Sequence, residues 1–400
     1  MTPLRHSDDR ATTPSQAWPL VVLSMESWTE VQRRVRIMTE LLVELDEGVD
    51  VLYVAPALDV PFEIRQRHFS ALRAKRHRRI HPRIHVLRPR KWWPRRLGNV
   101  ADRSLARQVE RQIRRLGFRH PVIWINDASY ADYALASGRP TLYDITDDWL
   151  QMPGDDRPRL RLKDQDERLV AEASEVVVCS PDLARTRGGK RPVVLLSNGV
   201  DVDRFQGNHA RPADLPAGAV ATYVGSLHDA RFDVDLVVDL AMSDPELAVV
   251  LVGPNHLEPE STAKLTRHDN IHVLGARPYA SVPAYMQHSD LIVVPHPVNA
   301  FTESLDPIKA YECLASGRPT VATPVAGFRD LGAPVVVADR DDFVARVHAT
   351  LADGRRPECK DDPTAPGPTS PIPTWRDRTL QLAAIFERLR RGRPSAGSAP

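Results

Sequence analysis

Short runs of apolar residues alternate with amphipathic helical patterns along most of the chain, and this alternation limits the possible folds more than any other feature. Leu20–Ser24 and Val49–Val54 are almost uninterrupted apolar runs, as expected of strands buried on both faces of a sheet. Between them, residues 31–45 carry apolar side chains at helical spacing. Strands that alternate with helices in this way predict a parallel, doubly wound α/β sheet.

The alternation occurs twice, on either side of a stretch at Leu195–Asn208 that is rich in Asn, Gly and Asp. A chain of 400 residues is also too long for one ordinary hydrophobic core. We therefore predict two Rossmann-like, doubly wound domains. The predicted divisions are a disordered lead-in at 1–17, an N-terminal domain at 18–207, a C-terminal domain at 208–354, a proline-rich linker at 355–374 and a last helix at 375–391.

The composition argues against several other classes of protein. The three cysteines lie far apart and show no metal-ligand spacing, which argues against a disulfide framework and fits a reducing compartment. No apolar run has the length of a membrane-spanning helix, and the first 17 residues lack the apolar core of a signal peptide. These features together predict a cytoplasmic protein.

The segment Phe301–Thr323 carries the strongest chemical pattern. Asp306 is suited to cap a helix, and Pro307 is suited to its first turn. Lys309 and Glu312 then lie three residues apart on one helical face. A helix N-terminus with a lysine beside it favours an anion such as a diphosphate, and a carboxylate one turn later can accept two hydrogen bonds from a ribose diol. The alternative is a capped surface helix with an ordinary ion pair.

This segment resembles the donor-binding motif of the GT-B glycosyltransferases, and three other segments resemble motifs that this family shows in the same order. They are a glycine turn at Gly225 and Ser226, a strand and turn ending at Gly253 and Pro254, and a hinge-entry sequence at Ser197–Asp201. The chain is similar in particular to bacterial enzymes of the teichuronic-acid type and to the xanthan-assembly glucuronosyltransferase. The resemblance implies two Rossmann-like domains that face each other across a cleft, with a C-terminal helix that returns to the N-terminal domain.

The resemblance also implies that a nucleoside-diphosphate sugar binds the C-terminal domain. Members of the wider family often carry two glutamates separated by seven residues, the first of them near the transferred sugar. Glu303 and Glu312 are separated by eight, so Glu312 matches the ribose ligand whereas Ser304 stands in register with the sugar ligand. Asp306 is a candidate to take over some contacts with the sugar. The expected donor-binding residues are Gly225, Ser226, Arg231, Gly253, Pro254, Ser304, Asp306, Lys309 and Glu312.

A second constellation is the segment Tyr143–Trp149, in which aspartates follow an apolar run. They lie at or after the C-terminal end of a predicted strand, which is the end that faces the ligand crevice in open α/β sheets. Crowded carboxylates raise one another's proton affinity, which suits a general base for an acceptor hydroxyl. The resemblance places this base at Asp147, with Asp148 as the second candidate. The alternative is that both aspartates cap a helix or lie in a solvated turn.

Arg231 lies a few residues after the glycine turn, where the family often has a basic side chain. A cation at this place would stabilise the departing diphosphate. An exposed loop arginine is the alternative interpretation. We expect no metal and no further cofactor, because the fold normally binds the diphosphate with a helix dipole and basic residues.

The interval between Glu63 and Asp102 contains no acidic residue, although it is rich in arginine and includes Trp92 and Trp93. Arginines beside tryptophans are suited to an anionic membrane surface. The same composition of the 64–101 segment could bind nucleic acid, or form a solvated basic loop. We favour peripheral binding to the inner face of the membrane, because related enzymes often use lipid-linked acceptors.

The sequence thus predicts an enzyme that transfers a hexosyl or related sugar from a nucleoside-diphosphate sugar to an acceptor hydroxyl, in cell-surface polysaccharide or glycoconjugate assembly. The acceptor could be a glycan, a lipid-linked sugar or a small molecule. Two other functions stay open, a nucleotide-sugar epimerase on the same fold and a nucleic-acid-binding protein. The sequence leaves the sugar, the base, the stereochemical course and the oligomeric state undetermined.

Overall fold

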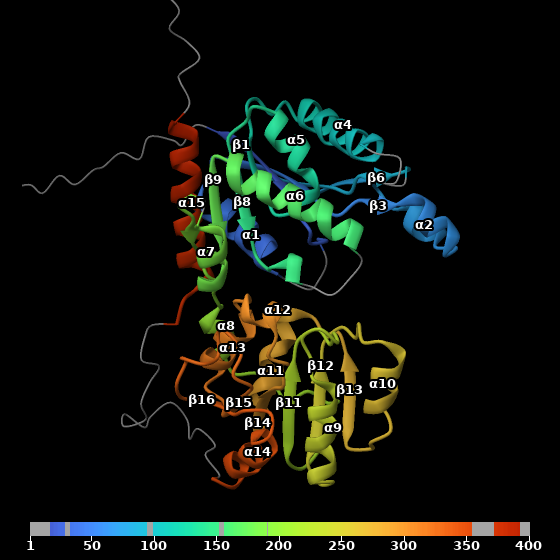
Figure 1. Cartoon of the computed structure of the whole chain (residues 1–400), viewed down its shortest axis with the longest axis vertical. Helices are drawn as coiled ribbons and strands as arrows, with labels where there is room; N and C mark the ends of the chain where they lie inside the picture. Colours follow the sequence, from blue (N-terminus) through green and yellow to red (C-terminus); the bar gives the residue numbers. More distant parts are fainter. Residues whose placement is uncertain are drawn as a thin grey trace, which may run out of the picture.

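The computed structural model of the chain describes residues 17–28, 33–93, 99–151, 156–189, 191–353 and 372–392. These residues form two α/β domains, one above the other in Figure 1, with a cleft between them. The predicted lead-in, except for its last residue, and most of the predicted proline-rich linker lie outside the described residues.

The N-terminal domain contains an eight-stranded sheet with the order β10-β9-β8-β7-β1-β2-β5-β4. All its strand pairs are parallel except that of β4 with β5. The strands are β1 (Trp18–Leu23), β2 (Val49–Val54), β4 (His77–His81), β5 (Ile84–Leu87), β7 (Val122–Ile125), β8 (Thr141–Ile145), β9 (Glu175–Val178) and β10 (Val194–Leu195). A separate two-stranded parallel ribbon pairs β3 (Leu58–Asp59) with β6 (Arg90–Lys91).

Helices cover both faces of this sheet, because its strands are apolar on both sides. One face buries α1 (Arg34–Leu45) and α15 (Trp375–Arg391), the other α4 (Val100–Arg115), α5 (Ala131–Ala136) and α6 (Asp156–Glu172). Phe386 of α15 packs its ring against Trp18 and Trp124 of the sheet, which confirms that the last helix returns to this domain. The remaining elements are α2 (Val60–Arg65), α3 (Phe69–Arg73), α7 (Pro181–Arg187) and the short 3-10 helices Ala128–Tyr130 and Trp149–Gln151.

The C-terminal domain contains a six-stranded, fully parallel sheet with the order β13-β12-β11-β14-β15-β16. Its strands are β11 (Val220–Val224), β12 (Ala248–Val252), β13 (Ile271–Gly275), β14 (Leu291–Val294), β15 (Thr320–Ala322) and β16 (Val335–Val337). Its helices are α8 (Val202–Gln206), α9 (Val234–Ser243), α10 (Pro259–Leu265), α11 (Val282–Gln287), α12 (Ala300–Glu303), α13 (Ile308–Ser316), α14 (Phe343–Ala352) and the 3-10 helix Tyr279–Ser281.

Each sheet changes its winding direction at one place, and these two places face each other. The switch lies between β1 and β7 in the first sheet and between β11 and β14 in the second. Ligands of open α/β sheets bind outside the carboxyl ends of the strands at such a switch point. The fold therefore directs two ligand-binding edges into one cleft.

The chain crosses between the domains twice, at adjacent places on one side of the cleft. Val200 donates its backbone N–H to Pro373 at 3.0 Å, and its carbonyl accepts from Trp375 at 3.3 Å. Gly199 lies so close to this second crossing that a Cβ would stand 2.6 Å from the Thr374 backbone. After the first crossing, α8 already buries Phe205 in the C-terminal core, so the chain changes domain before residue 207.

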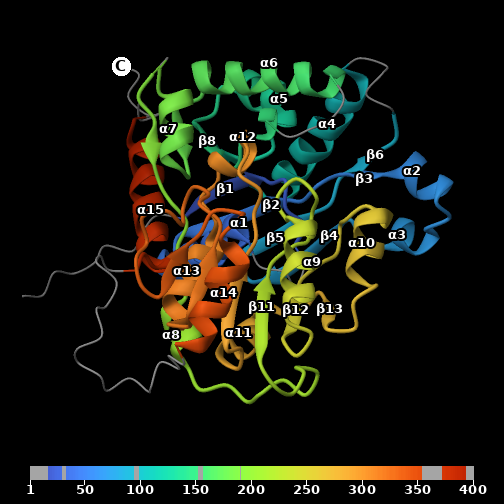
Figure 2. The ribbon, with the colours of Figure 1, turned by 60° about the horizontal axis from the view of Figure 1, so that its bottom comes forward.

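The basic segment forms regular secondary structure and is not the solvated loop that was one alternative from the sequence. It contains α3, β4, β5 and β6, because β4 adds to the edge of the sheet as the partner of β5. Figure 2 shows α2 and α3 projecting from the domain beside β3. Among the described residues, no helix combines the length and apolar character needed to cross a membrane.

Candidate functional site

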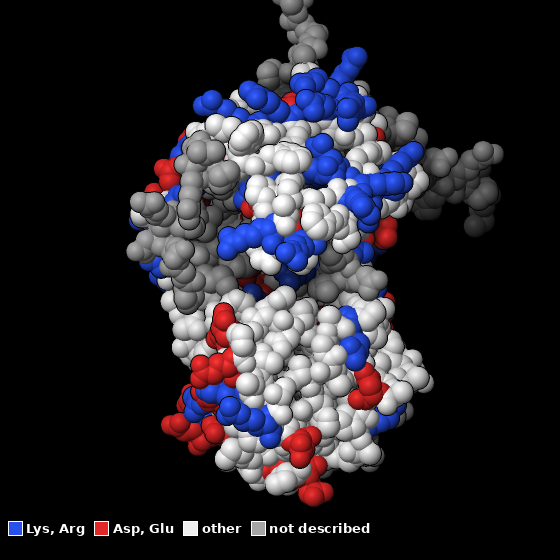
Figure 3. Space-filling model, turned by 90° about the vertical axis from the view of Figure 1, so that its right-hand side faces the viewer, with Lys and Arg blue, Asp and Glu red and all other residues white. Residues whose placement is uncertain are grey.

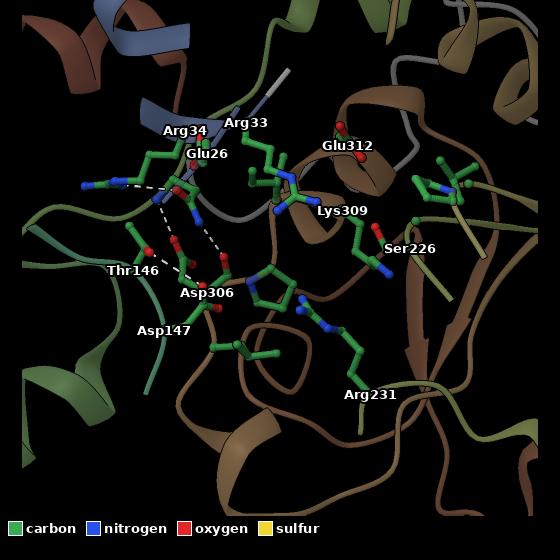
Figure 4. Close-up of a pocket in the computed structure, with 18 of the residues that line it drawn as sticks. Glu26, Arg33, Arg34, Thr146, Asp147, Ser226, Arg231, Asp306, Lys309 and Glu312 are labelled. Atoms are coloured by element: carbon green, nitrogen blue, oxygen red, sulfur yellow. Dashed lines mark hydrogen bonds between the residues drawn. The ribbon is translucent and has the colours of Figure 1, made fainter. Parts of the chain in front are cut away.

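A cavity of about 350 Å³ lies between the domains at the two switch points (Figure 4). The N-terminal wall comes from residues that follow β1, β7 and β8, and the C-terminal wall from residues that follow β11, β12 and β14 and from α13. The cavity brings together most of the predicted site residues: Asp147, Gly225, Ser226, Arg231, Gly253, Pro254, Asp306, Lys309 and Glu312.

Two glycine turns form part of the C-terminal wall. Gly225 has a φ of 146° and Gly253 a φ of 153°, which side-chain-bearing residues rarely adopt. A Cβ on Gly253 would lie 2.0 Å from the carbonyl oxygen of Gly225. A Cβ on Gly225 would lie 2.6 Å from the Lys309 Nζ. The two turns therefore pack directly on each other and keep this wall bare of side chains beside the lysine.

Lys309 projects from the first turn of α13 into this wall. Its Nζ donates to the Tyr223 hydroxyl at 2.6 Å and lies 3.1 Å from Nε2 of His296. Burial, followed by the nearby Arg231, lowers the pKa of Lys309 to about 7. Burial also holds the pKa of His296 well below its usual range, so this imidazole is neutral. A bound anion would therefore favour the charged form of Lys309.

Glu312 follows Lys309 by one turn on the same helix and is 6% exposed. Burial raises its pKa to about 7, while the Tyr279 hydroxyl and Lys309 act in the opposite direction. The carboxyl thus lines the cavity without a cation strong enough to balance its desolvation. A hydroxyl-bearing ligand that donates to it would stabilise the ionised form.

Arg231 reaches the cavity from the turn that follows β11. Its guanidinium lies over the ring of Phe301, 5.6 Å from the centroid. Its Nε is buried and has no hydrogen-bond partner within the described part of the chain. Arg231 and Lys309 therefore place two cationic groups in one wall.

Asp147 occupies the opposite wall, two residues after β8. Burial raises its pKa to about 6, and the cations that act against this are first Arg231 and then Arg33. The Thr146 hydroxyl donates to its Oδ2 at 3.5 Å. Asp147 is thus a half-buried carboxylate that faces the cleft and forms no ion pair within the part of the chain that the structure describes.

Two of the predicted residues lie outside the cavity. The Asp148 carboxylate is 2% exposed, pairs with Arg187 at 2.9 Å and accepts the backbone N–H of Leu150. Ser304 is fully buried, and its hydroxyl donates to the carbonyl of Phe301. Both polar groups are therefore used within the protein.

Asp306 lines the cavity, but its carboxylate is also engaged. It accepts the backbone N–H of Asn198 and, at 2.6 Å, the hydroxyl of Tyr311. Glu303 pairs with Arg329 and does not line the cavity. Glu312 thus differs from these two carboxylates, since it lines the cavity with only the Tyr279 hydroxyl and Lys309 acting on its charge.

Glu26 and Arg33 also line the cavity and were not predicted from the sequence. They belong to the segment after β1, beside the switch point, so their position could have indicated them. Among the described residues, no group of three or more His, Cys, Asp or Glu side chains is arranged to hold a metal ion.

Known proteins with a similar sequence include glycosyltransferases. Residues 218–353 match the model of the family Glycosyl transferases group 1. A protein of Bacillus subtilis strain 168, described as the teichuronic acid biosynthesis glycosyltransferase TuaH, is 24% identical over 221 residues, which are 51% of this chain and 55% of that protein. The chain therefore spans about half the length of this curated relative.

Solved structures match over almost the whole chain. Sucrose-phosphate synthase from Thermosynechococcus elongatus is 17% identical with a TM-score of 0.67, over 94% of this chain and 100% of that one. Anabaena Alr3699/HepE, solved with UDP and glucose, is 16% identical with a TM-score of 0.63. The match covers 93% of this chain and 100% of that one. The fold is accordingly the GT-B fold of glycosyltransferases. The predicted similarity to enzymes of the teichuronic-acid type is confirmed.

Neutralising Asp147 should raise the free energy of unfolding, whereas neutralising Asp148 should lower it. The native pKa of Asp147, about 6, lies above its ordinary value of 3.8, so its ionisation costs stability as pH rises between these values. Asp147→Asn should therefore raise the free energy of unfolding by about 1–2 kcal/mol at pH 8 and change it little at pH 4. Asp148→Asn should lower it by about 1–3 kcal/mol, because Arg187 loses one of its two buried carboxylate partners and keeps Asp166.

Urea unfolding of the two variants and the wild type at pH 8 and pH 4 measures both effects. Equal destabilisation by the two substitutions at pH 8 would contradict the different environments of these carboxylates.

Proposed function

We propose that the protein transfers a sugar from a nucleoside-diphosphate sugar to an acceptor hydroxyl. The observation that carries this proposal is the pairing of walls in one cavity: Lys309, Arg231 and two bare glycine turns face the carboxylate of Asp147. The first wall suits a diphosphate and the second suits a hydroxyl that must lose a proton. TuaH, which is described as a glycosyltransferase, supports the same activity.

The donor binds the C-terminal wall in this proposal. Its diphosphate lies against the turns at Gly225 and Gly253, where backbone can approach closely, and its charge is balanced by Lys309 and Arg231. The Glu312 carboxylate accepts hydrogen bonds from the ribose hydroxyls. Because two side-chain cations serve the diphosphate, the proposed reaction requires no metal ion.

The reaction follows from the placement of the two walls. The acceptor oxygen attacks the anomeric carbon and its proton passes to the Asp147 carboxylate, while the bond from that carbon to the diphosphate oxygen breaks. Arg231 and Lys309 stabilise the negative charge that develops on the departing diphosphate. A base in this position serves attack with inversion of the anomeric centre.

The two other functions considered from the sequence have less support. An epimerase needs no acceptor, so it would convert the donor alone, and the comparisons do not favour it. A nucleic-acid-binding protein would leave the Lys309–Glu312 wall without a role. Strongly salt-dependent binding of RNA or DNA, without binding of any sugar nucleotide, would support that function instead.

The basic segment provides a docking surface for the inner face of an anionic membrane. The parallel pairing of β3 with β6 brings the residues that follow both strands to the same end of the ribbon. Trp92 and Trp93 therefore emerge there together with α2, whose Phe62 is 52% exposed. Apolar side chains at this tip can enter the headgroup region, and the arginines around it can bind anionic lipids.

The charge of this surface is complementary to that of an anionic membrane, which supports the proposed docking. Figure 3 shows Lys and Arg gathered over the N-terminal domain and scarcely mixed with acids on this face. The pKa of Arg76 is lowered by partial burial and then by three neighbouring arginines, Arg90, Arg111 and Arg115. The fold thus holds like charges together where an anionic surface would relieve their repulsion.

Replacing the donor-site residues should weaken nucleotide binding. Glu312→Ala and Lys309→Ala should each cost about 1–3 kcal/mol, because each leaves a donor or acceptor of the nucleotide without a partner. Calorimetry with UDP, GDP, dTDP and ADP would measure this, with Lys264→Ala as the matched control on exposed α10. Unchanged affinity in both site variants would contradict the assignment.

Replacing the proposed base Asp147 should strongly lower turnover and leave the binding of the donor intact. Asp147→Asn should lower the release of nucleoside diphosphate in the presence of acceptor by about 10²-fold or more, while donor affinity is retained. Wild-type turnover should fall as pH drops through about 6, where Asp147 takes up its proton. Near-normal turnover of the variant would remove Asp147 from the role of base.

Membrane docking should depend on both charge and apolar insertion. The protein should co-sediment with phosphatidylglycerol vesicles at low salt, bind phosphatidylcholine vesicles poorly, and dissociate as salt rises. Trp92→Ala with Trp93→Ala, or Arg78→Ala with Arg79→Ala, should each weaken binding severalfold. Met242→Ala, which removes an exposed apolar side chain from the C-terminal domain, should not. Binding that ignores lipid charge would exclude this surface.

A further inference from the structure

Glu26 is a carboxyl of the central cavity to which the proposed reaction assigns no role. It lies three residues after β1, beside the switch point of the N-terminal sheet, and its side chain lines the cavity. Figure 4 shows it on the same side of the cavity as Arg33 and Arg34, and apart from Lys309 and Glu312. It therefore brings a carboxyl of the N-terminal domain into the space between the two walls.

The backbone of Glu26 is held in place from two sides. Its N–H donates to the Ser24 hydroxyl at 2.9 Å, and its carbonyl accepts the Tyr53 hydroxyl at 3.0 Å. The same Tyr53 hydroxyl lies 2.7 Å from the Ser24 hydroxyl, and Tyr53 is fully buried in β2. The side chain is consequently presented from a fixed loop, as a specific ligand contact requires.

The carboxyl itself is only partly satisfied. The backbone N–H groups of Val35 and Arg36, in the first turn of α1, lie against it and stabilise its charge, as does Arg33. Its Oε2 is nevertheless buried and has no hydrogen-bond partner in the described part of the chain. Burial outweighs the favourable contacts and raises the pKa of Glu26 to about 7. An unpartnered buried acceptor beside a cavity indicates a ligand that donates to it.

The donor-binding wall lacks such an acceptor for the transferred sugar. Glu303 is paired with Arg329, Asp306 is taken by Asn198 and Tyr311, and the hydroxyl of Ser304 is bonded to Phe301. Glu312 lies one turn beyond Lys309 on α13, where the proposed function places the ribose. A sugar that extends from the diphosphate towards Asp147 must therefore find its carboxylate acceptor on the N-terminal wall.

We infer that Glu26 binds hydroxyl groups of the donor's sugar, so that the N-terminal domain determines which sugar is transferred. This assignment rests on the proposed function, because it takes the nucleotide to lie on the C-terminal wall. Carboxylates suit this task because each oxygen accepts from a hydroxyl, and neighbouring hydroxyls of a pyranose can share one carboxylate.

The test compares sugar nucleotides with the matching free nucleotides. Calorimetry would be performed with UDP and UDP-glucose, GDP and GDP-mannose, dTDP and dTDP-glucose, and ADP and ADP-glucose, and the pair that the wild type binds most tightly would be kept. Glu26→Gln and Glu26→Ala should weaken the sugar nucleotide roughly tenfold or more while the free nucleotide binds as before. Glu44→Gln, an exposed carboxyl on α1, is the matched control, and thermal unfolding verifies that each variant is folded.

The possible results test the proposed function and the role of Glu26 separately. A wild type that binds none of the eight compounds overturns the proposed function itself. A wild type that binds them, with Glu26 variants that lose nothing or lose both members of the pair equally, overturns the role of Glu26 alone. Unchanged donor affinity with a raised KM for the acceptor would likewise overturn it, since Glu26 would then contact the acceptor.

Discussion

The ion pair between Arg34 and Asp144 is the interaction on which the geometry of the cleft depends. Both side chains are almost completely buried, at 3% and 1% exposed, so neither charge would be tolerated alone. Trp124 donates to the same carboxylate, and Arg34 also donates to Asn198 in the first crossing between the domains. Asn198 in turn bonds Asp306, immediately before the helix that carries Lys309 and Glu312. One continuous polar chain thus links the wall with Asp147 to the wall that is proposed to hold the donor.

The parts of this protein that are local in sequence could be predicted from it. Apolar runs and helical spacing predicted the two sheets, because burial on both faces leaves an uninterrupted apolar strand. Lys309 and Glu312 could be proposed together because one helix carries both residues at a fixed spacing. Gly225 and Gly253 were proposed from the resemblance, and the structure supplies their physical reason, since any side chain there would collide with the opposite turn or with the lysine.

The parts that depend on distant partners could not be predicted. Only the resemblance ranked Asp147 above Asp148, because Arg187, which pairs with Asp148, lies 39 residues further along the chain. Glu26 belongs to no motif that the sequence analysis could identify. Only the topology places it in the cavity, where its Oε2 has no hydrogen-bond partner among the described residues. Within the basic segment, the apolar run at residues 84–87 indicates β5. The sequence gives no such signal for β4, which consists mostly of basic residues and forms because β5 offers it an unpaired edge.

The two adjacent crossings near Val200 and Thr374 determine how the molecule can move. A single connecting strand permits both bending and twisting, whereas two strands tied to each other by backbone hydrogen bonds resist twisting. The softest relative motion of the domains is therefore a rotation about a line through this pair, on the side of the molecule where α8 and α15 lie in Figure 1. Opening would be smallest next to the Arg34–Asn198–Asp306 chain and largest at the far edge, near α2 and α10. A long acceptor could enter and leave sideways there, while the reacting groups stay close to the axis and keep their alignment.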